Sequence, residues 1–208
     1  MVNRTTKYSL FIVSLLAFFL LILFTFNTPW VKQLDFNVLH TIEGWRTDTL
    51  TPIIIFITTV GSWYVTAPIW FAIIVLLLYK RKGLLVLYIT LVFWGVRALN
   101  WGLKEIFARP RPDWSQVVPA SHYSFPSGHA MNSMAFYSGV LLLIWMYTRS
   151  RAVKTAAACV IAIVILLIGF SRLYLGVHFL TDILAGYCLG LAWSLGVYLL
   201  SKRLYNQK

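Results

Sequence analysis

Two histidines stand in sequence patterns that suit nucleophilic chemistry and proton transfer. His178 and Asp182 are four residues apart in "SRLYLGVHFLTD", so on a helix they would share one face and the carboxylate would reach the imidazole N–H. Such a pair fixes the tautomer of the ring and leaves its other nitrogen free, as a nucleophile requires. His129 ends the segment "PSGH" directly before a long apolar run, where an ionisable side chain is costly and usually functional.

The segment that leads to His129 also has the features of an anion site. Residues 126–129 begin a predicted helix, whose first amides have no intrahelical acceptors and lie at the positive end of the helix dipole. Gly128 allows a ligand to approach the backbone closely, and the Ser127 hydroxyl adds another donor. Pro-Ser-Gly-His is a weak signal by itself, because proline and serine are ordinary residues at helix starts.

Three cations flank these segments. Lys104 ends an apolar run, Arg111 stands between two prolines that restrict the chain, and Arg172 comes six residues before His178. A planar guanidinium binds two phosphate oxygens, whereas lysine supplies a point charge. Taken alone, Lys104 or Arg109 would be explained by snorkelling to a membrane interface.

The elements that must position these residues are membrane helices. Of the 208 residues, 60% are hydrophobic and only 12% are charged, which is far from the profile of a soluble domain. Apolar runs long enough to cross about 30 Å of hydrocarbon predict an all-α polytopic bundle of six transmembrane helices. They cover residues 9–26, 53–79, 83–103, 127–147, 155–171 and 178–200.

The charges predict the orientation of this bundle. If the N- and C-termini are cytoplasmic, eleven of the eighteen basic residues lie on the cytoplasmic face: Arg4, Lys7, Lys80, Arg81, Lys82, Arg149, Arg151, Lys154, Lys202, Arg203 and Lys208. The acidic residues then lie at or near the outer surface, so the net charge of +12 reflects topology and nucleic acid is not needed as a partner. The three motif-bearing segments also meet on the extracytoplasmic side of the cell membrane, where they can form one site.

Residues between the first two spans predict a helix along the outer interface. Apolar residues recur there at helical spacing, and the charged ones fall off that stripe. The apolar stripe is Val31, Leu34, Val38, Ile42 and Trp45, and the charged residues are Lys32, Asp35, Glu43 and Arg46.

Features inside the spans predict how they pack. Gly186 and Gly190 continue the stripe of Asp182 at i+4 spacing, so this face should pack closely against another helix. Arg97 shares a helix face with Lys104, which predicts that it looks into the bundle, where an acidic group is one possible partner.

Three motifs together resemble the signature of the type 2 phosphatidic acid phosphatase superfamily. They are Lys-x6-Arg-Pro at 104–112, Pro-Ser-Gly-His at 126–129 and Ser-Arg-x5-His-x3-Asp at 171–182, with matching order and spacing. The superfamily includes membrane lipid phosphatases, glucose-6-phosphatase and soluble vanadium haloperoxidases, and six spans in a compact chain are most similar to its bacterial lipid phosphatases. Residues 1–208 are accordingly expected to form a single membrane phosphatase domain.

The resemblance implies a role for each motif residue. His178 would attack phosphorus and form a phosphohistidine, Asp182 would orient it, and His129 would protonate the leaving oxygen. Five residues would hold the phosphate oxygens in place of a metal: Lys104, Arg111, Ser127, Gly128 and Arg172. No metal or other cofactor is expected.

The implied activity is that of a phosphoric monoester hydrolase acting on a phosphorylated membrane lipid within the bilayer. Phosphatidylglycerophosphate, hydrolysed to phosphatidylglycerol and phosphate, is the first choice of substrate. Undecaprenyl diphosphate is the runner-up, followed by phosphatidic acid and diacylglycerol diphosphate. No obligate protein partner is evident.

Three other functions fit these residues less well than a lipid phosphatase does. A phosphate-lipid or anion transporter would use the three cations and two histidines, but it needs neither an oriented nucleophile nor a site confined to one face. A soluble haloperoxidase does not fit so apolar a chain. A metal hydrolase lacks a clustered ligand set, and Cys159 and Cys188 lie within spans as small apolar residues.

Overall fold

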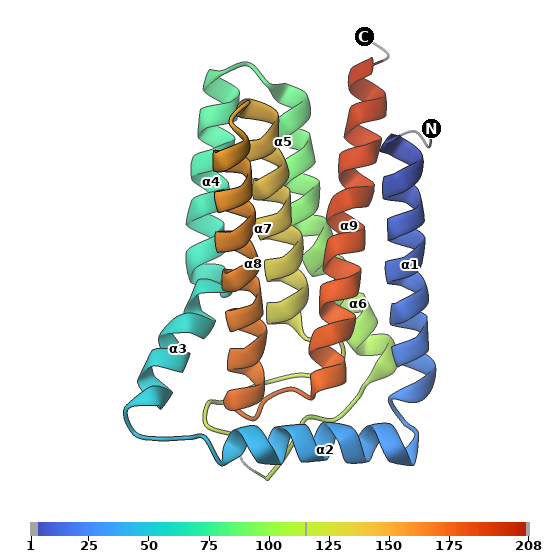
Figure 1. The fold of residues 1–208 in the computed structure, drawn as a ribbon, viewed down its shortest axis with the longest axis vertical. Coiled ribbons are helices and arrows are strands. Elements are labelled where there is room, and N and C mark those ends of the chain that lie inside the picture. Colours follow the sequence, from blue (N-terminus) through green and yellow to red (C-terminus); the bar gives the residue numbers. More distant parts are fainter. Residues whose placement is uncertain (1–3, 115, 207–208) are drawn as a thin grey trace.

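The computed structural model describes residues 4–114 and 116–206, and the regular elements in these ranges are all helices. The long helices stand side by side, and α2 lies crosswise at the end of the bundle opposite the two termini (Figure 1). Six helical stretches are long and apolar enough to cross a membrane, which confirms the predicted six-span bundle. The elements are α1 (Arg4–Thr25), α2 (Pro29–Glu43), α3 (Leu50–Val60), α4 (Trp63–Tyr79), α5 (Gly83–Thr90), a π-helical turn (Leu91–Gly95), α6 (Val96–Phe107), α7 (Gly128–Tyr147), α8 (Arg151–Tyr174) and α9 (Leu180–Asn206).

The second expected span is broken into α3 and α4 at Gly61, and α3 slants away from the bundle axis (Figure 1). A Cβ at Gly61 would lie 2.6 Å from Cγ2 of Ile168 and 2.8 Å from Oγ of Ser133. Only glycine lets the chain pass this close to α7 and α8 at the break. The break therefore brings the end of α3 against the two helices that carry His129 and Arg172.

The glycines of α9 set the contact between α7 and α9 at the centre of the bundle. A Cβ at Gly190 would lie 2.4 Å from the Met131 carbonyl oxygen, and one at Gly186 would lie 2.9 Å from the Ser127 carbonyl oxygen. These positions have no room for a larger residue, because the opposing atoms are backbone. The close packing predicted from the i+4 glycine stripe is confirmed, and it holds the start of α7 beside the start of α9.

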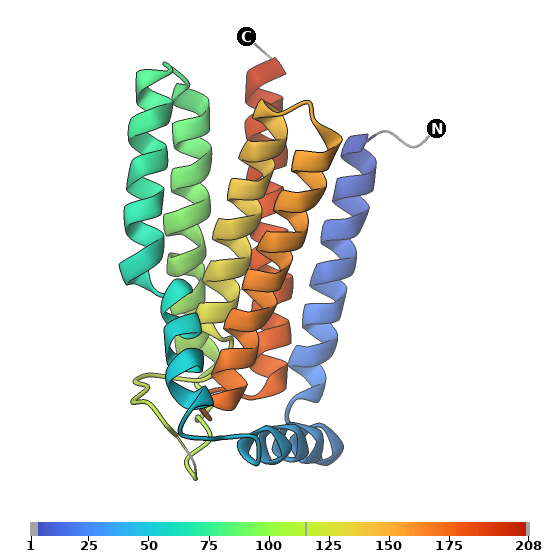
Figure 2. The same cartoon turned by 60° about the vertical axis from the view of Figure 1, so that its left-hand side comes forward.

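The interfacial helix α2 is present, but its buried face differs from the predicted one. The buried residues are Val31, Asp35, Leu39 and Ile42, whereas Leu34 and Trp45 of the predicted stripe are exposed. Figure 2 shows α2 nearly end-on, lying across the end of the bundle below α1 and α8. Asp35, predicted to lie off the buried stripe, is fully buried because it has polar partners on α9 and in the loop after α6.

Arg97 also has partners other than an acidic group. Its Nη1 donates to the Phe93 carbonyl oxygen at 2.6 Å, and its Nη2 donates to Thr66 Oγ1 at 2.9 Å. The guanidinium lies 3.6 Å from the centroid of the Phe93 ring. No acidic group among the described residues pairs with this cation, because a carbonyl, a hydroxyl and an aromatic face satisfy it inside the bundle.

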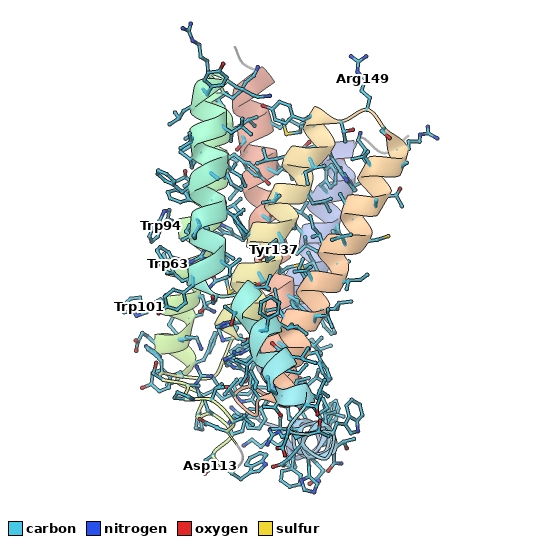
Figure 3. All side chains as sticks on the ribbon, turned by 90° about the vertical axis from the view of Figure 1, so that its left-hand side faces the viewer. Trp63, Trp94, Trp101, Asp113, Tyr137 and Arg149 are labelled. Atoms are coloured by element: carbon cyan, nitrogen blue, oxygen red, sulfur yellow. The ribbon has the colours of Figure 1, made fainter. Side chains whose placement is uncertain are left out.

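The end of the bundle that carries the termini is basic, whereas at the other end acidic and basic residues are about equal in number. The loops at the end with the termini contain Lys80, Arg81 and Lys82 between α4 and α5, and Arg149 before α8. Figure 3 shows Arg149 at this end and Asp113 at the other. Of the remaining basic residues expected here, Lys208 lies outside the described residues, and the side chains of Arg4 and Arg203 are not described.

Candidate active site

His178 lies in the short connection between α8 and α9, two residues before α9 begins, and its side chain is 3% exposed. The prediction that it starts the last span is therefore wrong by two residues. Its Nδ1 is 3.2 Å from Ser124 Oγ and 3.5 Å from Asp182 Oδ2. Its Nε2 is 3.1 Å from Nη1 of Arg111. The two ring nitrogens face different partners, and Nδ1 points towards Asp182 as predicted. The expected direct bond to the carboxylate is absent because His178 lies before the helix, and Nε2 contacts Arg111 where a free nitrogen was expected.

Asp182 is fully buried in the first turn of α9 and has three hydrogen-bond donors around its carboxylate. Oδ1 accepts from Arg109 Nη1 at 2.6 Å, and Oδ2 accepts from Ser124 Oγ at 2.5 Å and from the Phe179 backbone N–H at 2.9 Å. The last bond is the backward half of a capping box, in which an acid three residues into a helix accepts the N-cap amide. Together these bonds fix the orientation of the carboxylate.

Ser124 bridges Asp182 and His178. Its hydroxyl donates its proton to the carboxylate, so its oxygen accepts from the His178 Nδ1–H at 3.2 Å. The direct distance of 3.5 Å from Nδ1 to the carboxylate is too long for a good hydrogen bond. The orientation of the ring therefore depends on the serine as well as on Asp182. In this tautomer the proton is on Nδ1, and Nε2 is unprotonated.

Burial controls the charge of the His178 ring. Desolvation lowers the pKa of His178 to about 3; Asp182 acts to raise it, and the positive charges of Arg111 and Arg172 add to the lowering. The ring is neutral at physiological pH, which is the protonation state that a nitrogen nucleophile needs.

The Arg111 side chain joins two loops through hydrogen bonds to their backbone carbonyl oxygens. Its Nη1 donates to the Val177 carbonyl oxygen at 2.8 Å, and its Nε and Nη2 donate to the carbonyl oxygens of His122 and Ser121 at 2.8 and 2.9 Å. These bonds hold the guanidinium against Nε2 of His178. Burial lowers the pKa of Arg111, but a guanidinium retains its charge at neutral pH.

The other two motif cations surround the same centre. Lys104, at the end of α6, is buried, and its Nζ donates to the backbone carbonyl oxygens of Tyr123 and Ser124. Arg172, at the end of α8, is also buried, and its Nη1 donates to Thr58 Oγ1 of α3 at 2.7 Å. Lys104 therefore adjoins the residue that bridges His178 and Asp182, and Arg172 faces the broken second span.

The start of α7 adjoins the start of α9. The Ser127 backbone N–H donates to the Asp182 carbonyl oxygen at 3.0 Å, and α7 begins at Gly128, one residue after the predicted start of this span. A Cβ at Gly128 would lie 3.0 Å from Asn100 Oδ1, which makes this a tight position. The His129 ring is partly exposed, lies beside Gly61, and has no hydrogen-bond partner within the described ranges.

Two buried polar atoms at this centre lack partners among the described residues: Oγ of Ser127 and Nε of Arg172. Buried polar groups are almost always hydrogen-bonded, so each such atom calls for an explanation. Both atoms are donors on residues that the motifs assign to phosphate binding, and the oxygens of a phosphate are acceptors of the kind that they lack.

Three contributing residues were missed or misread from the sequence. Ser124 carries no local signal, because its role depends on contacts with α9. Arg109 was explained as snorkelling, yet its guanidinium is buried between two carboxylates, Asp182 and Asp35. Asp35 had a usable signal, since it shares helical spacing with the apolar Val31 and Leu39, which indicates a second possible face for α2.

Comparison with known proteins agrees with this arrangement. A model of the PAP2 superfamily matches residues 81–205, the part of the chain that holds all three motifs. This chain belongs to the PAP2 superfamily. The resemblance seen in the motifs is therefore confirmed, and the match extends over both loops that line the site.

Individual PAP2 proteins match most of the chain. Phosphatidylglycerophosphatase B of Bacillus subtilis (strain 168) is 36% identical over 183 residues, which make up 86% of this chain and 89% of that protein. Undecaprenyl-diphosphatase of Sulfolobus acidocaldarius is 27% identical over 176 residues, 79% of this chain and 73% of that one. The crystal structure of a transmembrane PAP2 type phosphatidylglycerolphosphate phosphatase from Bacillus subtilis superposes with a TM-score of 0.87 at 32% identity, covering 93% and 96% of the two chains. The chain is thus a multi-pass membrane protein with the PAP2 phosphatase fold.

Proposed function

We propose that this protein is a membrane lipid phosphatase that hydrolyses phosphatidylglycerophosphate to phosphatidylglycerol and phosphate, through a phosphohistidine on His178 and without a metal. The observation that carries the proposal is the setting of His178: a neutral ring whose Nδ1 is held by Ser124 and whose Nε2 faces Arg111. The 36% identity to phosphatidylglycerophosphatase B supports the choice of substrate. Its partners are the lipid substrate and the bilayer, with no nucleic acid and no obligate protein partner, and residues 1–208 act as one phosphatase domain.

The first chemical step forms a P–N bond and breaks a P–O bond. Nε2 of His178 attacks phosphorus once the Arg111 guanidinium has turned from this nitrogen to a phosphate oxygen. The alkoxide of the lipid leaves and takes a proton from His129. The ring becomes cationic, and the negative charge of Asp182 stabilises it through Ser124.

The second step reverses these roles. A water molecule attacks the phosphohistidine, the P–N bond breaks, and His129 takes the proton of the water and regains its starting state. The phosphate oxygens are held in both steps by the five donor residues of the motifs: Lys104, Arg111, Ser127, Gly128 and Arg172. The unpartnered Ser127 Oγ and Arg172 Nε support this assignment, because phosphate oxygens supply the acceptors that they lack.

A lipid diphosphate such as undecaprenyl diphosphate is the second candidate substrate. The similarity to an undecaprenyl-diphosphatase over 79% of the chain favours it. The same nucleophile and the same phosphate donors serve both classes of lipid. The two reactions therefore differ in the group that is expelled from phosphorus.

Phosphate release from defined lipids tests the proposed function. Purified protein in detergent is given phosphatidylglycerophosphate, undecaprenyl diphosphate, phosphatidic acid and diacylglycerol diphosphate, each with and without a chelator. Fastest release from phosphatidylglycerophosphate, unchanged by the chelator, is expected. Release from none of these lipids would contradict the proposal, and activity lost to the chelator and restored only by zinc or magnesium would replace it with a metal mechanism.

We also propose that the termini are cytoplasmic and that the site opens on the extracytoplasmic side of the cell membrane, because the basic loops lie at the opposite end of the bundle. Single cysteines at Ser121 and Arg151, in a chain whose two native cysteines are replaced, should react from opposite sides of intact cells. Reaction of both with an impermeant reagent added outside would contradict this orientation.

A further inference from the structure

We propose that Asp35, on the interfacial helix α2, is a positioning residue for the reaction and acts on Asp182 through the guanidinium of Arg109. The inference rests on the proposed function, because the state of Asp182 affects turnover only if His178 is the reacting group. It assigns to α2 a part in the chemistry, in addition to its place along the membrane surface.

One guanidinium joins the two carboxylates. Nη1 of Arg109 is 2.6 Å from Oδ1 of Asp182, and Nη2 is 2.8 Å from Oδ2 of Asp35. The side chains of Arg109, Asp35 and Asp182 are 8%, 1% and 0% exposed, so water screens these contacts little. The planar fork has a fixed geometry, and a shift of Asp35 therefore turns the group that holds Asp182.

Asp35 has a second connection to Asp182 through the preceding residue. Thr181 donates its backbone N–H to Asp35 Oδ1 at 3.0 Å and its hydroxyl to Asp35 Oδ2 at 2.6 Å. The same hydroxyl accepts from Arg109 Nη1 at 2.8 Å. The carboxylate of α2 thus fixes the backbone at the start of α9 as well as the cation beside Asp182.

The charges of this cluster suit the reaction. Two carboxylates share one guanidinium, so the cluster of Asp35, Arg109 and Asp182 carries a net charge of about −1 when all three are ionised. With Arg109 alone as its partner, Asp182 would be neutralised. Because Asp35 takes one arm of the guanidinium, negative charge is left to stabilise the His178 ring when it becomes cationic on phosphorylation.

The decisive variant is Asp35→Asn, which keeps the size of the side chain and removes its charge. Asp48→Asn is the matched control, because Asp48 is an exposed acid in the loop directly after α2, at the same end of the bundle. Single-turnover reactions with 32P-labelled phosphatidylglycerophosphate give two quantities: the amplitude, which reports the fraction of molecules able to form phosphohistidine, and the rate of its formation.

For Asp35→Asn we expect the amplitude of the parent protein and a rate lowered about 10- to 100-fold. This is the range by which activity falls when a metal ligand loses its outer-shell partner, and Asp35 has the equivalent part for Asp182. Asp48→Asn should keep both values. Steady-state kcat should fall with the rate, whereas KM should change little because Asp35 is not among the phosphate donors. A purely structural role for Asp35 would lower the amplitude and leave the rate of the remaining molecules unchanged, which would overturn the proposal.

Thr181→Val provides a second variant if Asp35→Asn yields too little folded protein. It keeps the three charges and removes the hydroxyl that joins Asp35 to Arg109. A rate lowered about fivefold, equivalent to one ordinary hydrogen bond, is expected at full amplitude. An unchanged rate would overturn the proposal. Failure of the parent protein to form phosphohistidine would instead contradict the proposed function itself, so the two failures are distinguishable.

Discussion

Replacing Ser124 with alanine tests the bridge between His178 and Asp182. The substitution removes one oxygen atom and with it two contacts, the 3.2 Å contact to His178 Nδ1 and the hydrogen bond to Asp182 Oδ2. The direct distance between Nδ1 and the carboxylate, 3.5 Å, is too long to replace them. The imidazole N–H is thereby left without a good acceptor in a site where both Ser124 and His178 are buried.

The magnitude follows from the cost of an unsatisfied buried donor, about 1–3 kcal/mol. If this cost falls on the transition state, in which the ring becomes cationic, the rate of phosphohistidine formation drops roughly 5- to 150-fold. Ser121→Ala is the control, because Ser121 is exposed in the same loop and contacts Arg111 only through its backbone carbonyl. Rapid-quench measurement of the labelled enzyme gives the rate directly. A Ser124→Ala rate equal to that of the control would refute the bridge and show that Asp182 orients the ring unaided.

Three further predictions concern the acid, the pH dependence and the helix contact. His129→Ala should lower kcat/KM by about 10²–10⁴-fold on phosphatidylglycerophosphate, whose alkoxide needs a proton, and much less on a lipid diphosphate, which expels phosphate; equal losses would count against His129 as the acid. Burial lowers the pKa of His178 to about 3, so its nucleophilic neutral form is lost only as the pH falls towards that value. Phosphohistidine formation from a lipid diphosphate should therefore not slow as the pH falls from 7 to 5. A rate that drops tenfold per pH unit below about pH 6.5 would contradict this. Gly190→Val should lower the thermal stability of the protein in detergent and its activity together, because even a Cβ would lie 2.4 Å from the Met131 carbonyl oxygen, whereas Gly196→Val, at a position with open space, should change neither.

The parts of the site that lie in local patterns could be predicted from the sequence. The helix start at Gly128, the cation between two prolines at Arg111 and the spacing of His178 and Asp182 each depend on neighbouring residues, so their geometry follows from short-range rules. The six spans follow from length and apolarity, and the break at Gly61 lies inside one of them. The segment Thr-Thr-Val-Gly-Ser at 58–62 marks the place in the sequence, but the need for a glycine there comes from the close approach of α7 and α8, which only the fold supplies.

The parts that depend on distant contacts could not be read from local patterns. Asp35 and Arg109 look like interfacial charges in isolation, and only the fold brings α2 and the loop after α6 to the start of α9. Ser124 likewise precedes its motif by two residues and acquires its role from Asp182. For Arg97 an acidic group was one possible partner on electrostatic grounds, yet the Phe93 carbonyl and the Thr66 hydroxyl satisfy it.

The most direct test of the account is to identify the residue that receives the phosphoryl group. The parent protein and His178→Ala are each mixed with 32P-labelled phosphatidylglycerophosphate, quenched within the first turnover, and mapped by mass spectrometry after protease digestion. We expect an acid-labile label on His178 of the parent protein and no label on the variant, with the variant as stable to heat as the parent. A label on a serine or aspartate, or an undiminished label on His178→Ala, would contradict the claim that His178 is the nucleophile.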